Sequence, residues 1–177
     1  FANLTLDPDA CERIVSDGAT ETIVALSHSD ESEVRRYSCK AVFNLTRMKG
    51  REATIVQQGV LGSMIRLRQE SFECSFACSV AIYNLSCVNS SYLRMEKVVQ
   101  TTITIINNVM DSVSDNGWSS SRSGSEKKVD LLKPCVQALK NYSNIESFRA
   151  RLMEEGALHS VKHMENGTVS TLIALCM

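Results

Sequence analysis

A short phrase, Ala-x-x-Asn-(Leu/Tyr)-(Ser/Thr), recurs along this chain of 177 residues and constrains its fold more than any other feature. The phrase is AVFNLT at residues 41–46, AIYNLS at 81–86 and ALKNYS at 138–143. Its asparagines lie at Asn3, Asn44, Asn84 and Asn141, at intervals of 41, 40 and 57 residues. Self-similarity at a period of roughly 20–50 residues is typical of stacked helical repeats.

A second marker follows the asparagines at a constant distance. A glycine stands 15 residues after three of them, as Gly18, Gly59 and Gly156, and Val99 stands at the fourth place. Glycine can adopt a positive φ and end a helix sharply. The markers therefore predict units of three helices, in which the first ends at the glycine and the third carries the asparagine. The expected helices cover about 9–17, 20–28, 32–46, 50–58, 60–69, 72–87, 90–98, 100–111, 129–143, 145–155 and 157–165.

Each expected third helix places its core residues on one stripe at about 100° per residue. The three stripes are Val34, Ser38, Ala41, Val42 and Leu45; Cys74, Cys78, Ala81, Ile82 and Leu85; and Leu131, Cys135, Ala138, Leu139 and Tyr142. The alanine in each stripe leaves room for a neighbouring helix to approach closely. The first helices should bury the residues three and four before each glycine, which are Ile14 and Val15, Ile55 and Val56, and Leu152 and Met153.

These features resemble the armadillo repeat family, in the period of about 40 residues, in the asparagine phrase and in glycine phrases such as ERIVSDGATETIVAL and ATIVQQGVLGSMIRL. The resemblance covers essentially the whole chain. It implies an all-α fold, a right-handed superhelix (α-solenoid) of three-helix repeats whose third helices line a concave groove. We expect a single armadillo-repeat domain over 1–177, a fragment of a longer armadillo-repeat protein. Its expected parts are a partial repeat at 1–7, repeats at 8–46, 47–86 and 87–143, a Ser-rich insertion at about 112–128, and an incomplete repeat at 144–177.

The resemblance also implies a binding site, because in this family the asparagine side chain hydrogen-bonds the backbone of an extended partner peptide. The asparagines expected to make these bonds are Asn3, Asn44, Asn84 and Asn141, which we call the rung residues. Helical geometry places further residues opposite the core stripe. They are Arg36, Tyr37 and Lys40 in the first full repeat, Phe76 and Val80 in the second, and Lys133 and Gln137 in the third. The family's nuclear-import receptors carry a tryptophan four residues before the asparagine. This chain has none there, so it is not expected to bind nuclear localisation signals.

Residues 112–128, SVSDNGWSSSRSGSEKK, have the composition of a flexible loop. The plainer interpretation is a tolerated surface insertion. The alternative is a partner-binding loop that is anchored by Trp118, the only tryptophan of the chain.

Charge and cysteine content narrow the classes of partner and compartment. The formal net charge is −1, and no apolar run approaches the length of a membrane span, so neither nucleic acid nor a membrane is expected as a partner. The seven cysteines lack a CxxC spacing, and three of them fall at helical core positions. This pattern predicts buried thiols in a reducing compartment. The N-x-(Ser/Thr) sequons at the repeat asparagines are therefore interpreted as coincidental.

Residue patterns that indicate catalysis are absent from the sequence, which has no Gly-rich phosphate loop, no GxSxG and no HExxH. His159 and His163 have a metal-compatible spacing but are interpreted as a helix surface pair. We expect a non-enzymatic cytoplasmic scaffold without a cofactor, which binds an extended protein or peptide segment in a concave groove. One alternative is a structural subunit of a large cytoskeletal or ciliary (axonemal) assembly. Another is the substrate-recruiting arm of a ubiquitin ligase or other enzyme.

Overall fold

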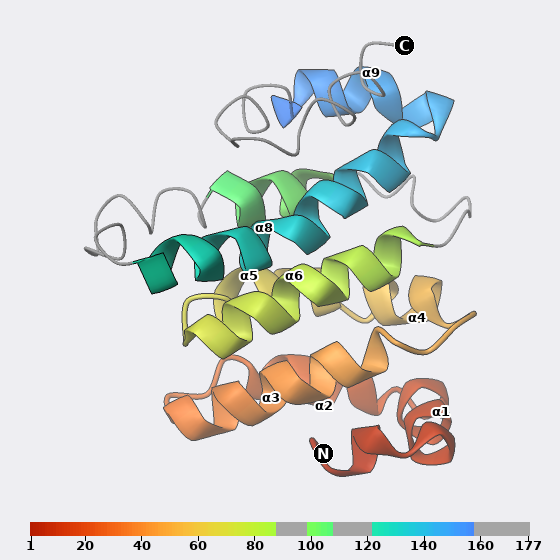
Figure 1. The fold of residues 1–177 in the computed structure, drawn as a ribbon. Coiled ribbons are helices and arrows are strands. Elements are labelled where there is room, and N and C mark those ends of the chain that lie inside the picture. The colour runs from red at the N-terminus through yellow and green to blue at the C-terminus, as the bar shows by residue number, and fades with distance from the viewer. Residues whose placement is uncertain (88–98, 108–121, 158–177) are drawn as a thin grey trace. The chain divides into compact units, whose positions relative to one another are not determined.

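The computed structural model describes residues 1–87, 99–107 and 122–157 (Figure 1). Within these residues all regular elements are helices and none is a strand, which confirms the prediction of an all-α chain. The chain divides into two compact units, Phe1–Val88 (unit 1) and Asn89–Met177 (unit 2). Trp118 and the histidine pair at 159 and 163 lie outside the described residues.

Unit 1 consists of a 3-10 helix, η1 (Leu4–Leu6), and two successive sets of three α-helices. Set one is α1 (Pro8–Ser16), α2 (Ala19–Leu26) and α3 (Ser32–Leu45), and set two is α4 (Glu52–Gln57), α5 (Val60–Leu67) and α6 (Phe72–Ser86). These bounds lie within two residues of the expected ones. The short-short-long order of the helices is therefore confirmed in unit 1.

The marker glycines adopt the backbone conformation that the sequence predicts. Gly18 has a φ of 75° between α1 and α2, and Gly59 has a φ of 90° between α4 and α5. Their backbone N–H groups donate to the carbonyls of Val15 and Val56, at 3.3 and 3.1 Å. A left-handed glycine lets the chain close one helix and begin the next without a linker.

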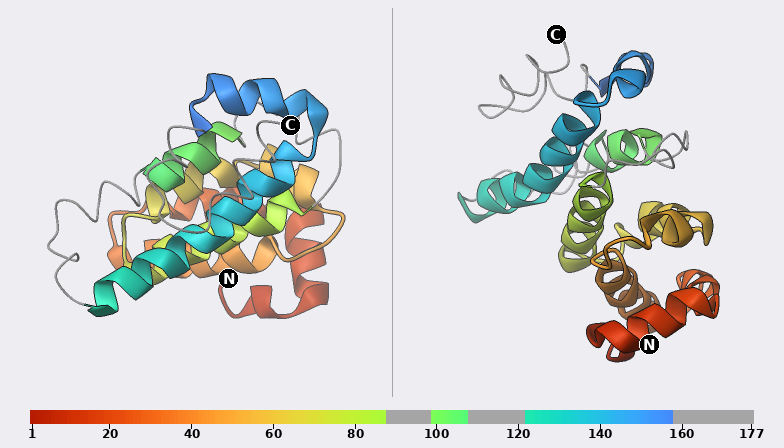
Figure 2. Two further views of the ribbon diagram at one scale, coloured as in Figure 1. Left: turned by 45° about the horizontal axis from the view of Figure 1, so that its top comes forward. Right: turned by 90° about the vertical axis from the view of Figure 1, so that its right-hand side faces the viewer.

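The core of unit 1 lies between the third helices and the second helices. Figures 1 and 2 show α3 and α6 side by side, with α2 and α5 packed behind them. The predicted stripe residues of α3 and α6 are buried, apart from Val34, which is half-buried. Ala41 and Ala81 are completely buried, as their position on the stripes predicted.

Unit 2 contains a helical segment at 99–107, α8 (Arg122–Ser143) and α9 (Glu146–Glu154). The third-helix stripe predicted from Leu131 to Tyr142 is buried, and the Tyr142 ring packs edge-on against Phe148 at 6.0 Å between centroids. Gly156 follows α9 with a φ of 80°.

Two expectations for unit 2 are wrong. The predicted loop does not extend to residue 128, because α8 begins at Arg122. Helix propagation adds one hydrogen bond for each residue fixed, so a stable helix over 129–143 can extend through a Glu-Lys-Lys segment of good helix formers. Met153 was expected in the core but is exposed, while its neighbour Leu152 is fully buried. Adjacent helical residues point about 100° apart, so one of two neighbours can leave the core.

Candidate interaction surface

Two of the recurring asparagines, Asn44 and Asn84, hydrogen-bond the preceding copy of the phrase. The Nδ2 atom of Asn44 donates to Oγ1 of Thr5 at 3.1 Å and, at 3.5 Å, to the carbonyl of Ala2. The Nδ2 atom of Asn84 donates to Oγ1 of Thr46 at 3.3 Å. Thr5 and Thr46 each stand two residues after the preceding asparagine of the series. Each asparagine amide therefore joins its own helix to the end of the previous phrase.

The final Ser or Thr of the phrase also completes its own helical turn. Its hydroxyl donates to the backbone carbonyl three residues earlier, at 2.9 Å from Thr5, 2.8 Å from Thr46, 2.7 Å from Ser86 and 2.8 Å from Ser143. The last carbonyls of a helix lack intrahelical partners, so this bond satisfies one of them. The phrase thus has a structural role in each copy, which sequence reasoning missed although the fixed Asn-to-Ser/Thr spacing was visible.

The four predicted rung residues differ in exposure. Asn3 is exposed before η1, whereas the exposed fraction of Asn44 is only 9%. Asn84 and Asn141 are half-buried, and Oδ1 of Asn141 accepts a hydrogen bond from Nε2 of Gln137 at 3.3 Å. The amide nitrogens of Asn44 and Asn84 bond within the chain, so the amide oxygens are the groups that these residues can offer a partner.

The predicted residues Arg36, Tyr37 and Lys40 lie on α3, and Phe76 and Val80 lie on the neighbouring helix α6. We call these five residues together the α3–α6 face. Tyr37 and Phe76 are large side chains with exposed fractions of 56% and 41%. Arg36 and Lys40 are exposed and Val80 is half-buried. The Nζ atom of Lys40 lies 5.3 Å from the centroid of the Tyr37 ring, which is a cation–π contact. The face is thus cationic and aromatic on α3 and apolar on α6.

The predicted residues of unit 2 lie on α8. Lys133 and Gln137 are both exposed, and Nζ of Lys133 forms an ion pair with Oδ1 of Asp130 at 3.4 Å. Pro134 lies inside the helix. A proline in a helix interior removes one backbone hydrogen bond, so the backbone beside Lys133 differs from that of α3 and α6.

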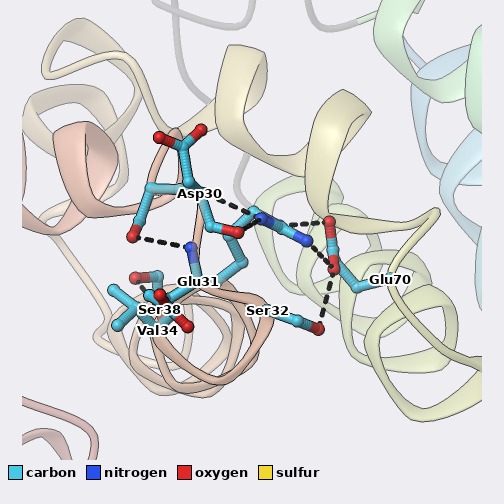
Figure 3. A network of polar contacts seen from close by, with 8 residues as sticks. Asp30, Glu31, Ser32, Val34, Ser38 and Glu70 are labelled. Atoms are coloured by element: carbon cyan, nitrogen blue, oxygen red, sulfur yellow. Dashed lines mark hydrogen bonds and ion pairs between the residues drawn. The ribbon is translucent and has the colours of Figure 1, made fainter.

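Glu70, in the turn between α5 and α6, lies opposite Ser32 at the start of α3 (Figure 3), and Arg35 joins the two segments. The Nε and Nη2 atoms of Arg35 contact the two Glu70 oxygens at 2.5 and 2.9 Å, and Nη1 donates to the carbonyls of Ser29 and Asp30, each at 2.7 Å. The hydrogen bond from Arg35 holds the pKa of the Glu70 carboxyl below its ordinary value. This bidentate pair orients the first turn of α3, immediately before Arg36 and Tyr37.

A second set of polar contacts joins the first helices of the two sets. Arg51 forms a bidentate ion pair with Glu12, with Nε 3.1 Å from Oε2 and a second contact between Nη2 and Oε1. The Nε2 atom of Gln58 donates to the carbonyl of Val15 at 3.1 Å. Neighbouring helix sets in unit 1 are therefore joined by side-chain hydrogen bonds at both their first and their third helices.

No group of three His, Cys, Asp or Glu side chains in the described part of the chain is arranged to hold a metal ion. None of the described helices is long and apolar enough to cross a membrane. Comparison of the sequence with models of known protein families gives no match. Comparison with curated proteins gives no match either.

Proposed function

We propose that this chain is a non-enzymatic armadillo-type repeat scaffold that binds an extended protein segment along the α3–α6 face. The observation that carries the proposal is the exposure of Tyr37 and Phe76 on neighbouring helices, next to the uncovered cations Arg36 and Lys40. Aromatic side chains and arginine are enriched at protein interfaces, where they supply most of the binding energy.

The repeated contacts of unit 1 support the repeat assignment. Asn44 and Asn84 make the same bond to the preceding phrase, and Gly18 and Gly59 make the same turn. In repeat proteins each unit contacts mainly its neighbours, and their stacking creates an extended binding surface. An extended partner matches such a surface better than a compact one.

The chemistry of the face predicts the chemistry of the partner segment. Carboxylates of the partner would lie near Arg36 and Lys40, and an apolar side chain would pack on Phe76 and Val80. Backbone N–H groups of the partner could donate to the amide oxygens of Asn44 and Asn84, which sets the register but reads little sequence. Because the two cations are exposed, added salt should weaken the binding.

Selection from a random peptide library on the immobilised chain, followed by affinity measurement with charge-reversed variants, tests this proposal. Lys40→Glu should weaken binding of the selected peptides by about tenfold or more, because it reverses an attraction at the centre of the face. Lys49→Glu is the matched control, since Lys49 is exposed outside the face, between α3 and α4. Equal losses in the two variants, or selected peptides without acidic residues, would show that the partner binds elsewhere.

A further inference from the structure

Three cysteine side chains from two helices meet in the core of unit 1. Cys39 comes from α3, and Cys74 and Cys78 come from consecutive turns of α6. The Sγ atoms of Cys39 and Cys78 lie 3.9 Å apart, and Sγ of Cys39 lies 3.7 Å from the Cys74 carbonyl oxygen. A disulfide bond has an S–S distance of about 2.05 Å, so the first pair could form one after a movement of about 2 Å shared by two side chains.

A buried cation lies close enough to Cys78 to interact with it electrostatically. Arg68, at the end of α5, has an exposed fraction of 9%, and its Nε atom has no hydrogen-bond partner. Among the described residues its guanidinium has no ion pair. Burial lowers the pKa of Arg68, whereas the charge of an ionised Cys78 raises it. A buried charge without a partner is costly, so a thiolate at Cys78 would supply the anion that Arg68 lacks.

The neighbouring thiols differ from Cys78 in their surroundings. The hydrogen bond to Cys74 lowers the pKa of Cys39, but the contact with Cys78 and burial outweigh it, so the pKa of Cys39 is raised well above that of an ordinary thiol. The contact with Cys39 and burial likewise raise the pKa of Cys74, and they outweigh the hydrogen bond from Ser71 and the charge of Arg36, which lower it. The thiolate is the reactive form of a cysteine, and Arg68 is the buried cation that interacts with Cys78. Cys78 is therefore the first sulfur to react, and Cys39 is positioned to resolve its product.

We propose that Cys78 and Cys39 form an oxidation site, at which a peroxide-class oxidant converts the two thiols into a disulfide that links α3 to α6. The Cys78 thiolate attacks one peroxide oxygen, the O–O bond breaks, and Cys78 becomes a sulfenic acid while hydroxide leaves. The Cys39 sulfur then attacks the Cys78 sulfur and loses its proton, and the sulfenic oxygen leaves as water. In sum, two thiols and one hydrogen peroxide give one disulfide and two waters. This site does not depend on the binding proposed for the α3–α6 face.

Hydrogen peroxide is the appropriate probe because Cys39 and Cys78 are each 1% exposed, which excludes bulky reagents. The experiment uses the Cys87→Ser chain, since Cys87 is exposed and would react on its own. After peroxide treatment, remaining thiols are blocked and the unreduced digest is analysed by mass spectrometry. We expect a peptide pair that joins Cys39 to Cys78 and is 2 Da lighter than the two free peptides.

Cys11 is the internal control. It is buried, its Sγ donates to the Thr5 carbonyl at 3.1 Å, and the described structure places no second thiol beside it. Burial and Asp7 raise its pKa. The Cys39–Cys78 link should therefore form before Cys11 is oxidised. Oxidation of Cys11 at the same rate, or a link from Cys39 to Cys74, would overturn the proposal.

Substitutions of Arg68 test the origin of the reactivity. Arg68→Met should slow formation of the link about tenfold, because it removes the buried cation that interacts with Cys78. Arg68→Lys keeps the charge and should retain most of the rate. In the Cys39→Ser variant, Cys78 should stop at a sulfenic acid that dimedone traps. Link formation that is equally fast in folded Arg68→Met and in the parent would contradict the role of Arg68. If Arg68→Met does not fold, the proposal is still tested by the rate of link formation in Arg68→Lys and by the rate of Cys11 oxidation.

Discussion

The two third helices of unit 1 are similar in their buried residues and different in their exposed ones. Both α3 and α6 bury a completely inaccessible alanine, followed four residues later by a completely inaccessible leucine. On the outer side α3 carries Arg36 and Lys40 where α6 carries Phe76 and Val80. The inner residues repeat because each helix must pack against the same kind of neighbour. The outer residues are free of that constraint, so the binding that we propose would depend on them.

The two helices also begin in different ways. At α6 the Ser71 hydroxyl accepts a hydrogen bond from the Cys74 backbone N–H at 3.2 Å, which is a local N-cap. At α3 the residue before the helix, Glu31, makes no such bond, and Arg35 instead joins the first turn to Glu70. The start of α6 therefore depends on neighbouring residues, and the start of α3 depends on a residue of the second helix set.

The largest effects should come from the shared interior. Leu45→Ala and Leu85→Ala should each lower the free energy of unfolding by about 2–5 kcal/mol, because both remove a fully buried side chain. Urea denaturation measures both losses. Lys40→Ala, on the outer side of α3, should change stability by about 0.5 kcal/mol or less. If one leucine variant loses several times less unfolding free energy than the other, the interiors of α3 and α6 are not equivalent.

Overpacking should distinguish the two faces of α6. Ala81→Leu should cost about 1–3 kcal/mol, since no space remains around a completely buried alanine. Ala77→Leu is the matched control on the outer side, where the alanine is half-buried, and we expect a much smaller loss. Thermal melts of the two variants make the comparison. Ala81→Leu with an unchanged melting temperature would show that the surroundings of Ala81 are not tightly packed.

The hydrogen bonds of Asn44 and Asn84 should contribute less to the free energy of unfolding than the buried apolar side chains do, and the two should contribute unequally. Asn44→Ala should cost about 1 kcal/mol or somewhat more, and Asn84→Ala somewhat less, because Asn44 is more buried and its amide makes two bonds instead of one. Double-mutant cycles with Thr5→Ala and Thr46→Ala isolate each pair. Coupling energies near zero in both cycles would mean that the phrase recurs for the packing of its apolar residues alone.

The smallest effect should be a pH dependence confined to the start of α3. Arg35 lowers the pKa of folded Glu70, so the pair stabilises the fold above the ordinary carboxyl pKa of 4.5 and loses this contribution as the pH falls below it. Glu70→Gln should therefore be slightly less stable than the parent at neutral pH, and the difference should shrink in acid. Unfolding curves at several pH values measure this difference. If the difference stays constant down to the acid limit of folding, the charge of Glu70 plays no part.

Sequence periodicity predicted the helices of unit 1, the burial of the alanine stripe and the left-handed turns at Gly18 and Gly59. Those features depend on side-chain spacing within one helix and on the conformational freedom of one residue, so a linear pattern contains them. The pattern was wrong at residues 122–128, where neither marker applies, and at Met153, which the glycine marker placed in the core. Helix propensity alone predicts such positions poorly, because the end of a helix also depends on the residues that pack beside it.

Only the tertiary structure decided which polar groups and thiols meet. Asn44 bonds Thr5 across 39 residues, Arg35 pairs with Glu70 across 35, and the Cys39 sulfur lies beside that of Cys78 across 39. The repeat period brings such positions into the same region, since successive helices stack. Whether two side chains actually touch depends on the angle and distance between packed helices, to within an ångström or two. That geometry is set by the summed packing of both cores, which no short stretch of the sequence encodes.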